Sequence, residues 1–265
     1  MTADIDIIIP VYGGKQHLER LVPALVETTA DLPVQVWFSE DATPDAKGGP
    51  EVRAWLTAQC VGRPNWHTIF AGKNGGFSAA NNRAAAVAQG EFICMLNSDT
   101  VPHKNWLHAM RSTMKALPQV GAVGAKLIWP PWATGARIPG AVQHAGVAFN
   151  AQRMPYHIME GFPPDHRLVN RPLLMKACTG ACLLVRRKLW DQVGGLDEAF
   201  GQGNFEDIDL CLKIAQLGYE IAYCPTAVLY HTGSGSDNVL DAERNTYLFI
   251  HRWQREIVSD DWMYW

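Results

Sequence analysis

The stretch EFICMLNSDT, residues 91–100, sets an apolar run against an abrupt polar stop. The run from Phe92 to Leu96 has the side chains of a buried strand, and Asn97, Ser98 and Asp99 follow at once. Asn, Ser and Asp all hydrogen-bond their own backbone, so the triplet predicts a turn. Taken alone, Asp99 is better explained by that turn than by chemistry. Its neighbours along the chain decide whether the carboxylate also has a functional role.

The sequence before this stretch alternates between strand and helix patterns. Continuous apolar runs at 5–11, 34–39 and 67–71 are typical of strands that are covered on both faces. An apolar stripe from Leu18 to Val26 predicts a helix, and Pro23 within it predicts a kink or a late helix start. This alternation predicts an α/β fold, with a mostly parallel, doubly wound central sheet and helices on both faces.

Ligands of such a sheet bind in the crevice beyond the carboxyl ends of its strands. Polar residues and glycines stand at four of these ends, namely 10–13, 39–41, 72–76 and 97–99. We therefore expect these four segments to line one pocket.

The pattern changes near residue 125. Residues 129–140 and 150–172 are rich in Pro, Gly, Trp and His, and loops of this length usually carry function or stay mobile. Regular patterns then return, and they predict a strand at 177–187, a helix at 206–218, two strands at 220–225 and 227–231, and a final helix at about 239–257.

Composition limits the class of protein. A chain of 265 residues with 48% hydrophobic and 18% charged residues is expected to form one large domain with a real core. Its net charge of −3 argues against a nucleic-acid partner. Neither a signal peptide nor a membrane-spanning segment is expected. Six cysteines fit no disulfide scaffold, which favours a reducing, cytoplasmic compartment.

Two features in the first half could bind a ligand. The glycines of KNGGFSAANN, residues 73–82, adjoin a helix start, where backbone N–H groups can approach an anion. A strand-to-helix turn explains them equally well, and their spacing matches neither a P-loop nor a dinucleotide fingerprint. Glu40 and Asp41 follow the second strand, where ordinary loop acids are the default explanation.

Two further features stand in the second half. Glu206, Asp207 and Asp209 begin a predicted helix, where acids stabilise the helix dipole. His231 ends an apolar strand beside a Gly/Ser loop, and a lone histidine is more often structural than a ligand. Each feature is weak on its own, so their order along the chain becomes the evidence.

Five ordered blocks, taken together, resemble glycosyltransferase family 2, in its rhamnosyltransferase-like branch with the GT-A fold. The blocks cover nearly the whole chain, and they are IIIPVYGG (7–14), NGGFSAANNRAAAVAQGEFICMLNSDT (74–100), GAVQHAGVAF (140–149), TGACLLVRRKLWDQVGGLDEAF (179–200) and EDIDLCLKIAQLGYEIAYCPTAVLYH (206–231). The resemblance implies one domain with a nucleotide-sugar half at 1–125, an acceptor and catalytic half at 126–236, and a C-terminal helix and tail at 237–265.

The resemblance also assigns roles near the reacting groups. Asp99 and His231 would hold a divalent cation, Mn²⁺ or Mg²⁺, that bridges the donor's diphosphate. Asn97 stands where many relatives carry an aspartate, so a second carboxylate ligand is missing. Asp207 would be the general base, with Glu206 beside it orienting the site.

Donor and acceptor contacts follow in the same way. Glu40 and Asp41 would contact the base and ribose of the nucleotide. The remaining donor-side residues that the resemblance implies are Pro10, Tyr12, Asn74, Gly75, Asn81, Asn97 and Ser98. Candidates for the acceptor side, by their place in the irregular middle, are Trp129, Trp132, His144 and His157.

The implied function is inverting, metal-dependent transfer from a UDP- or dTDP-sugar to a hydroxyl of a saccharide or glycoconjugate, as in polysaccharide biosynthesis. A lipid-linked acceptor would be met at the membrane surface. One alternative, a sugar-nucleotide nucleotidylyltransferase, needs a glycine-rich loop with Arg and Lys, and PVYGGKQH supplies only Lys15. The other, a catalytically silent glycan-binding module, fits poorly with the joint presence of Asp99, Asp207 and His231.

Overall fold

The computed structural model describes residues 3–132, 138–233 and 239–265. The strands within them are β1 (Ile5–Val11), β2 (Val34–Glu40), β3 (Trp66–Phe70), β4 (Phe92–Leu96), β5 (Thr100–Pro102), β6 (Val120–Ile128), β7 (Val142–His144), β8 (Val147–Phe149), β9 (Pro155–His157), β10 (Leu173–Met175), β11 (Cys182–Arg186) and β12 (Glu220–His231). The helices are α1 (Lys15–Thr29), α2 (Gly49–Cys60), α3 (Gly76–Ala85), α4 (Trp106–Ala116), α5 (Arg187–Val193), α6 (Glu206–Gln216) and α7 (Val239–Trp253), with 3₁₀ turns η1 (Asp45–Lys47), η2 (Glu198–Phe200) and η3 (Asp261–Met263).

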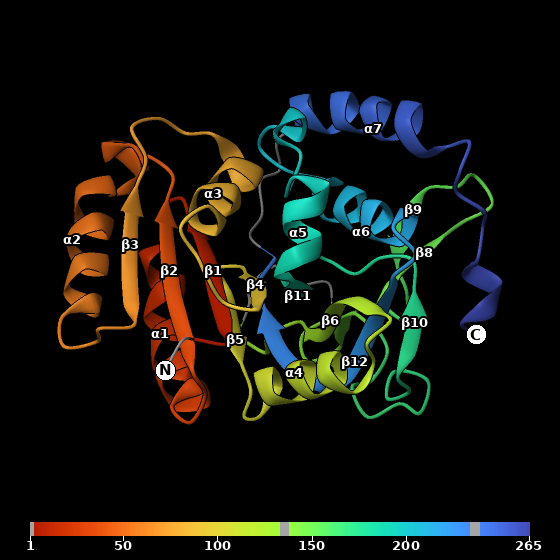
Figure 1. The fold of residues 1–265 in the computed structure, drawn as a ribbon, viewed down its shortest axis with the longest axis horizontal. Coiled ribbons are helices and arrows are strands. Elements are labelled where there is room, and N and C mark those ends of the chain that lie inside the picture. The colour runs from red at the N-terminus through yellow and green to blue at the C-terminus, as the bar shows by residue number, and fades with distance from the viewer. Residues whose placement is uncertain (1–2, 133–137, 234–238) are drawn as a thin grey trace.

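One sheet runs through the whole molecule (Figure 1). Its order is β10-β12-β6-β11-β4-β1-β2-β3, with β5 paired to β12 and β7 paired to β6. The four strands predicted in the first half, β1 to β4, pair in parallel. Beyond β4 the sheet becomes mixed, because β11 lies antiparallel between β4 and β6.

Helices cover both faces of this sheet and bury two apolar clusters. On one face α1, α2 and α4 pack with residues such as Leu18, Leu56 and Met110, all fully buried. On the other face α3, α5 and α6 pack with residues such as Ala84 and Leu210. The helix α1 begins at Lys15 and continues through Pro23, so the late start allowed by the sequence does not occur.

Several elements of the mixed half were not predicted, and the longest of them are the helix α4 and the strand β6. All nine residues of β6 are buried, yet the strand is rich in Gly and Ala. A Cβ on Gly121 would lie 2.6 Å from Ile214 Cγ2, and one on Gly124 would lie 2.3 Å from Cys178 Cβ. Close packing therefore requires small residues in β6, and these residues interrupt the continuous apolar run by which a buried strand is predicted.

The later strands also differ in extent from their predictions. The segments 220–225 and 227–231 form one strand, β12, with a register shift between Cys224 and Val228. Pro225 lies at this irregularity, where its missing N–H costs no ladder hydrogen bond. The strand predicted at 177–187 is only Cys182–Arg186, and α7 ends at Trp253.

The helix α7 packs onto the chain that leads into α6 (Figure 1). Asn245 Nδ2 donates to the carbonyl oxygens of Phe200 and Gly203, at 2.6 Å each. The buried carboxylate of Asp209 accepts from Arg252 Nη1 at 2.6 Å and from Trp253 Nε1 at 2.8 Å. Within the described residues, no helix combines the length and the hydropathy needed to cross a membrane.

Candidate active site

A cavity of about 770 Å³ opens beyond the carboxyl ends of the first four strands. All four segments that were expected to share a pocket contribute to it, because parallel strands end at the same edge. Its lining residues are Pro10, Val11, Tyr12, Gly13, Gly14, His17, Asp41, Lys47, Asn74, Gly76, Phe77, Ala80, Asn97, Ser98, Asp99 and Gln202.

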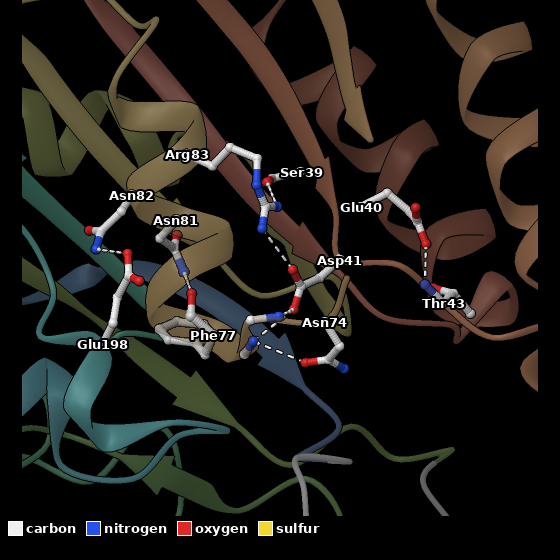
Figure 2. A network of polar contacts seen from close by, with 12 residues as sticks. Ser39, Glu40, Asp41, Thr43, Asn74, Phe77, Asn81, Asn82, Arg83 and Glu198 are labelled. Atoms are coloured by element: carbon white, nitrogen blue, oxygen red, sulfur yellow. Dashed lines mark hydrogen bonds and ion pairs between the residues drawn. The ribbon is translucent and has the colours of Figure 1, made fainter. Parts of the chain in front are cut away.

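Asp41 shapes one wall of this cavity (Figure 2). Its Oδ2 accepts from the N–H groups of Gly75 and Gly76, at 2.9 and 2.8 Å, and its Oδ1 accepts from Arg83 Nη2 at 2.9 Å. The anion at the N-terminus of α3 is therefore the protein's own carboxylate. This contact ties the glycine segment to the end of β2.

Glu40 and Asn81, both predicted on the donor side, point away from the cavity. Glu40 is fully buried, and its Oε1 accepts from the N–H of Thr43 at 2.6 Å (Figure 2). Side chains alternate across a strand, so when Asp41 faces the cavity Glu40 must face the other way. Asn81 is also fully buried, and its Nδ2 donates to the Phe77 carbonyl. Both residues support the wall rather than line it.

Asp99 and His231 meet although 132 residues separate them. The antiparallel pairing of β12 with β5 sets His231 opposite Thr100, and the N–H of Thr232 donates to the Asp99 carbonyl at 3.1 Å. The side chains follow, with His231 Nε2 3.2 Å from Asp99 Oδ1. Only 13% of the His231 side chain and 8% of the Asp99 side chain are exposed.

Asn97 completes this cluster. Its Nδ2 lies 3.3 Å from His231 Nε2, and its buried Oδ1 has no hydrogen-bond partner among the described residues. A carboxylate, an imidazole and a spare amide oxygen are donors that Mg²⁺ and Mn²⁺ accept. The three side chains thus fit one divalent cation. The triplet also turns the chain, since the Thr100 hydroxyl donates to the Asn97 carbonyl.

Asp207 is held beside the same cavity from the other half of the chain. Its Oδ2 accepts from the Gly180 N–H at 2.7 Å, and its Oδ1 accepts from the Ile208 N–H at 2.8 Å. A Cβ on Gly180 would lie 3.0 Å from Asp207 Cβ and 3.5 Å from the ring of Phe77, a cavity residue. The Ala181 carbonyl accepts from the Asn97 N–H at 2.9 Å, which links the base candidate to the Asn97–Asp99 turn.

Glu206 stands next to Asp207 but is buried. Burial first, and then the adjacent Asp207 carboxylate, raise the pKa of Glu206 to about 8. The Glu206 side chain is therefore protonated at neutral pH. Its Oε2 has no hydrogen-bond partner among the described residues.

The four acceptor-side candidates surround β7 and the end of β12, outside the cavity lining. His144 is fully buried, and its ring meets that of His157 edge-on at 4.5 Å. Burial, followed by the nearby imidazoles of His157 and His231, holds the pKa of His144 well below its usual range, so its ring is neutral. Trp132 is 44% exposed, and Trp129 packs where Gly233 has no side chain.

Several cavity residues were not among the sequence candidates, chiefly Lys47, Phe77 and Gln202. Lys47 Nζ lies 4.6 Å from the centre of the Tyr12 ring. Gln202 Nε2 donates to Asn74 Oδ1 at 3.3 Å, which joins the loop before α6 to the donor side. Phe77 carried a signal, because it stands in the glycine block itself. Gln202 carried none, since only the tertiary fold brings it there.

The mixed sheet with helices on both faces is the GT-A fold. A sequence model of the family described as Glycosyl transferase family 2 matches residues 6–194. The chain therefore belongs to this family. Its relatives place it in the rhamnosyltransferase-like branch.

Two relatives and one solved structure illustrate the match. The O-antigen biosynthesis protein RfbC of Myxococcus xanthus is 29% identical over 89% of this chain, which spans only 18% of that protein. An N-acetylglucosaminyl-diphospho-decaprenol L-rhamnosyltransferase of Mycobacterium tuberculosis is 26% identical over 94% of this chain and 85% of its own length. The crystal structure of GalNAc-T7 with UDP, GalNAc and Mn²⁺ superposes with a TM-score of 0.75, at 14% identity, over 96% of this chain and 50% of that one.

Proposed function

We propose that the protein transfers a sugar, with inversion, from a UDP- or dTDP-sugar to a hydroxyl of a saccharide or glycoconjugate, with the help of Mn²⁺ or Mg²⁺. The observation that carries the proposal is the 3.2 Å contact between His231 Nε2 and Asp99 Oδ1 beside the cavity. The carboxylate of Asp207, fixed by two backbone N–H groups, stands near the same cavity.

The donor lies in the cavity, with its nucleoside toward Tyr12 and Asp41 and its diphosphate toward Asp99. Asp99 and His231, with Asn97 beside them, would hold a divalent cation, whose positive charge would stabilise the departing nucleoside diphosphate. The same assignment explains why Asn97 keeps an unpartnered oxygen.

The acceptor hydroxyl has a high pKa and needs a carboxylate within hydrogen-bond reach. Asp207 takes that proton as the hydroxyl oxygen forms its bond to the anomeric carbon, while the bond from this carbon to the diphosphate oxygen breaks. One base suffices because no covalent intermediate forms. Glu206 is neutral beside it, so Asp207 is not paired with a second negative charge at neutral pH.

The acceptor site extends toward Trp132, His144 and His157, which lie around β7 and the end of β12. An exposed Trp132 gives an apolar face on which a sugar ring can stack. We place the reaction in the cytoplasm, in polysaccharide biosynthesis, with a lipid-linked acceptor met at a membrane surface. All six cysteines, which lie within the described residues, are free thiols, as a reducing compartment requires.

The test is hydrolysis of a panel of UDP- and dTDP-sugars, with Mn²⁺ or EDTA, by the wild type and by Asp99→Asn. Wild type is expected to release nucleoside diphosphate from at least one donor only with the metal, and Asp99→Asn is expected to lose this activity. Asp191→Asn, an exposed acid on α5, is the matched control. Equal rates with EDTA, or an unchanged rate in Asp99→Asn, would remove the metal from the mechanism.

A second readout does not need the correct sugar. Nucleoside diphosphates are screened for thermal stabilisation of the protein with Mn²⁺, because a ligand that binds the native state raises its melting temperature. UDP or dTDP is expected to give the largest shift. A triphosphate with a larger shift would instead favour the nucleotidylyltransferase.

A further inference from the structure

Gln143 lies behind the metal-site candidate His231 and touches it twice. Gln143 Oε1 is 2.6 Å from His231 Nδ1, and Gln143 Nε2 donates to the His231 carbonyl oxygen at 3.4 Å. Only 5% of Gln143 is exposed. The buried amide of Gln143 therefore contacts both the ring and the backbone of His231.

The two contacts fix the orientation of the amide. A backbone carbonyl only accepts hydrogen bonds, so the atom of Gln143 that faces it must be the nitrogen. The amide oxygen must then face His231 Nδ1, and an oxygen acceptor there requires a proton on Nδ1. Of the two neutral tautomers of His231, the contact therefore favours the one whose Nε2 carries the lone pair.

The local backbone explains how Gln143 reaches this place. In the pairing of β6 with β7, Leu127 stands opposite His144 and Ile128 stands opposite Val142. Gln143 is the extra residue between these two pairs, which is a β-bulge. Bulges re-aim a side chain and occur often beside active sites.

The free Nε2 faces polar groups rather than apolar packing, a carboxylate oxygen that can bind a cation and an amide N–H that can donate a hydrogen bond. Asp99 Oδ1 lies 3.2 Å away, and Asn97 Nδ2 lies 3.3 Å away. A lone pair set against a carboxylate oxygen suits a shared cation. Histidine ligands of metals commonly have their second nitrogen fixed by a carbonyl or carboxylate partner in this way.

We propose that Gln143 is the positioning residue that sets the tautomer and the orientation of His231 for divalent-cation binding. The inference rests on the proposed function, because it gives Gln143 its role through the cation. Gln143 does not touch the cavity itself, so it acts only through His231.

The first experiment measures binding of Mn²⁺ in the presence of UDP, by electron paramagnetic resonance of the free ion. Gln143→Leu, which removes the acceptor, is expected to weaken binding about 10- to 100-fold. Gln143→Glu, which keeps an oxygen acceptor, is expected to stay within about threefold of the wild type. In a His231→Ala background, Gln143→Leu is expected to cause no further loss.

A matched control comes from the other end of the sheet. Gln35 Oε1 lies 2.7 Å from His67 Nε2, so Gln35 and His67 form a similar pair away from the cavity. Gln35→Leu is expected to leave Mn²⁺ binding unchanged. If Gln143→Leu also leaves it unchanged while the wild type binds, the inference fails and the proposed function stands. If the wild type binds no Mn²⁺ with UDP, the proposed metal site fails and this inference fails with it.

The second experiment needs no folded Gln143 variant. The ¹⁵N shifts of the imidazole nitrogens are measured in metal-free wild type, and the His231 signals are identified by their loss in His231→Ala. A protonated Nδ1 and an unprotonated Nε2 are expected. A proton on Nε2 would overturn the inference, whatever the binding data show.

Discussion

The acids of the two halves of the molecule face different circumstances. In the first half, Asp41 and Glu40 are engaged with backbone N–H groups of their own neighbourhood, so they build the cavity wall. In the second half, Asp207 also accepts from two backbone N–H groups, but its neighbour Glu206 has one oxygen without a hydrogen-bond partner in the described part of the chain, and its pKa is raised to about 8 by burial and by Asp207. The comparison teaches that hydrogen bonds from backbone N–H groups do not by themselves distinguish an acid that shapes a binding site from one that is proposed to react.

The base candidate gives the largest expected effect. Asp207→Asn keeps an oxygen to accept from the Gly180 N–H but cannot take a proton, so turnover is expected to fall about a thousandfold. The measurement is the initial rate of nucleoside diphosphate release, with Mn²⁺ binding measured in parallel and expected to be unchanged. A rate near that of the wild type would end the assignment of Asp207 as base.

Glu206→Gln tests the buried acid next to it through stability. The folded chain keeps a proton on Glu206 up to about pH 8, whereas the unfolded chain releases it above its ordinary value of 4.5. Unfolding between these values releases a proton, so this group makes the wild type less stable as the pH rises from about 4.5 to 8. Glu206→Gln lacks this loss and is expected to gain about 5 kcal/mol in stability relative to wild type between pH 4.5 and pH 9, at about 1.4 kcal/mol per pKa unit.

Urea denaturation at pH 6, 7, 8 and 9 provides the measurement. The stability gap between Glu206→Gln and wild type is expected to widen up to pH 8 and then level off. Glu243→Gln, an exposed glutamate on α7, is the control and is expected to show no gap. A constant gap at every pH would mean that Glu206 is ionised in the folded protein.

Asp41→Ala tests the wall. It leaves two backbone N–H groups and Arg83 without their acceptor, at a cost of about 2 kcal/mol in the free energy of unfolding. The partly exposed Arg83 contributes little of this. Asp45→Ala, in the same loop and 88% exposed, is expected to change stability by less than about 0.5 kcal/mol. Equal stability of the two variants in urea would show that the hydrogen bonds to Asp41 do not stabilise the fold.

Tyr12→Ala carries the smallest effect. The Tyr12 ring is 42% exposed in the cavity, and loss of a stacking surface for the nucleobase is expected to weaken UDP binding about tenfold. Tyr12→Phe should bind as the wild type does. Phe70→Ala removes an equally exposed ring at the end of β3, away from the cavity lining, and should leave calorimetric affinity unchanged. Similar losses of UDP affinity in Tyr12→Ala and Phe70→Ala would mean that the nucleobase does not stack on Tyr12.

Much of the fold could be predicted from the sequence, because continuous apolar runs such as Ile5–Val11 give one clear pattern for a strand covered on both faces. The strand β6 could not be predicted, because its glycines are required by close packing against Ile214 and Cys178, which lie far along the chain. The helix α4 could have been found, because Trp106, Leu107, Met110 and Met114 form one buried stripe.

The site was less accessible than the fold. The positions of Asp99 and Asp41 at strand ends follow from a parallel sheet. The meeting of Asp99 with His231 depends on the register of β12 against β5, which the sequence does not encode locally. The opposite orientation of Glu40 follows from strand alternation once the register is known. Gln143 depends on a bulge, and one extra residue in a short strand leaves no periodic signal.

Gly76 has a consequence for anyone who wishes to change donor choice. Its φ is +85°, and a Cβ there would lie 2.1 Å from the Gly201 carbonyl oxygen, so the two halves of the chain touch at a point with no spare volume. In a mutant library, any side chain at position 76 would therefore push the two halves of the chain apart. Substitutions at Phe77, the next residue, change the cavity lining and leave the close contact between Gly76 and Gly201 intact.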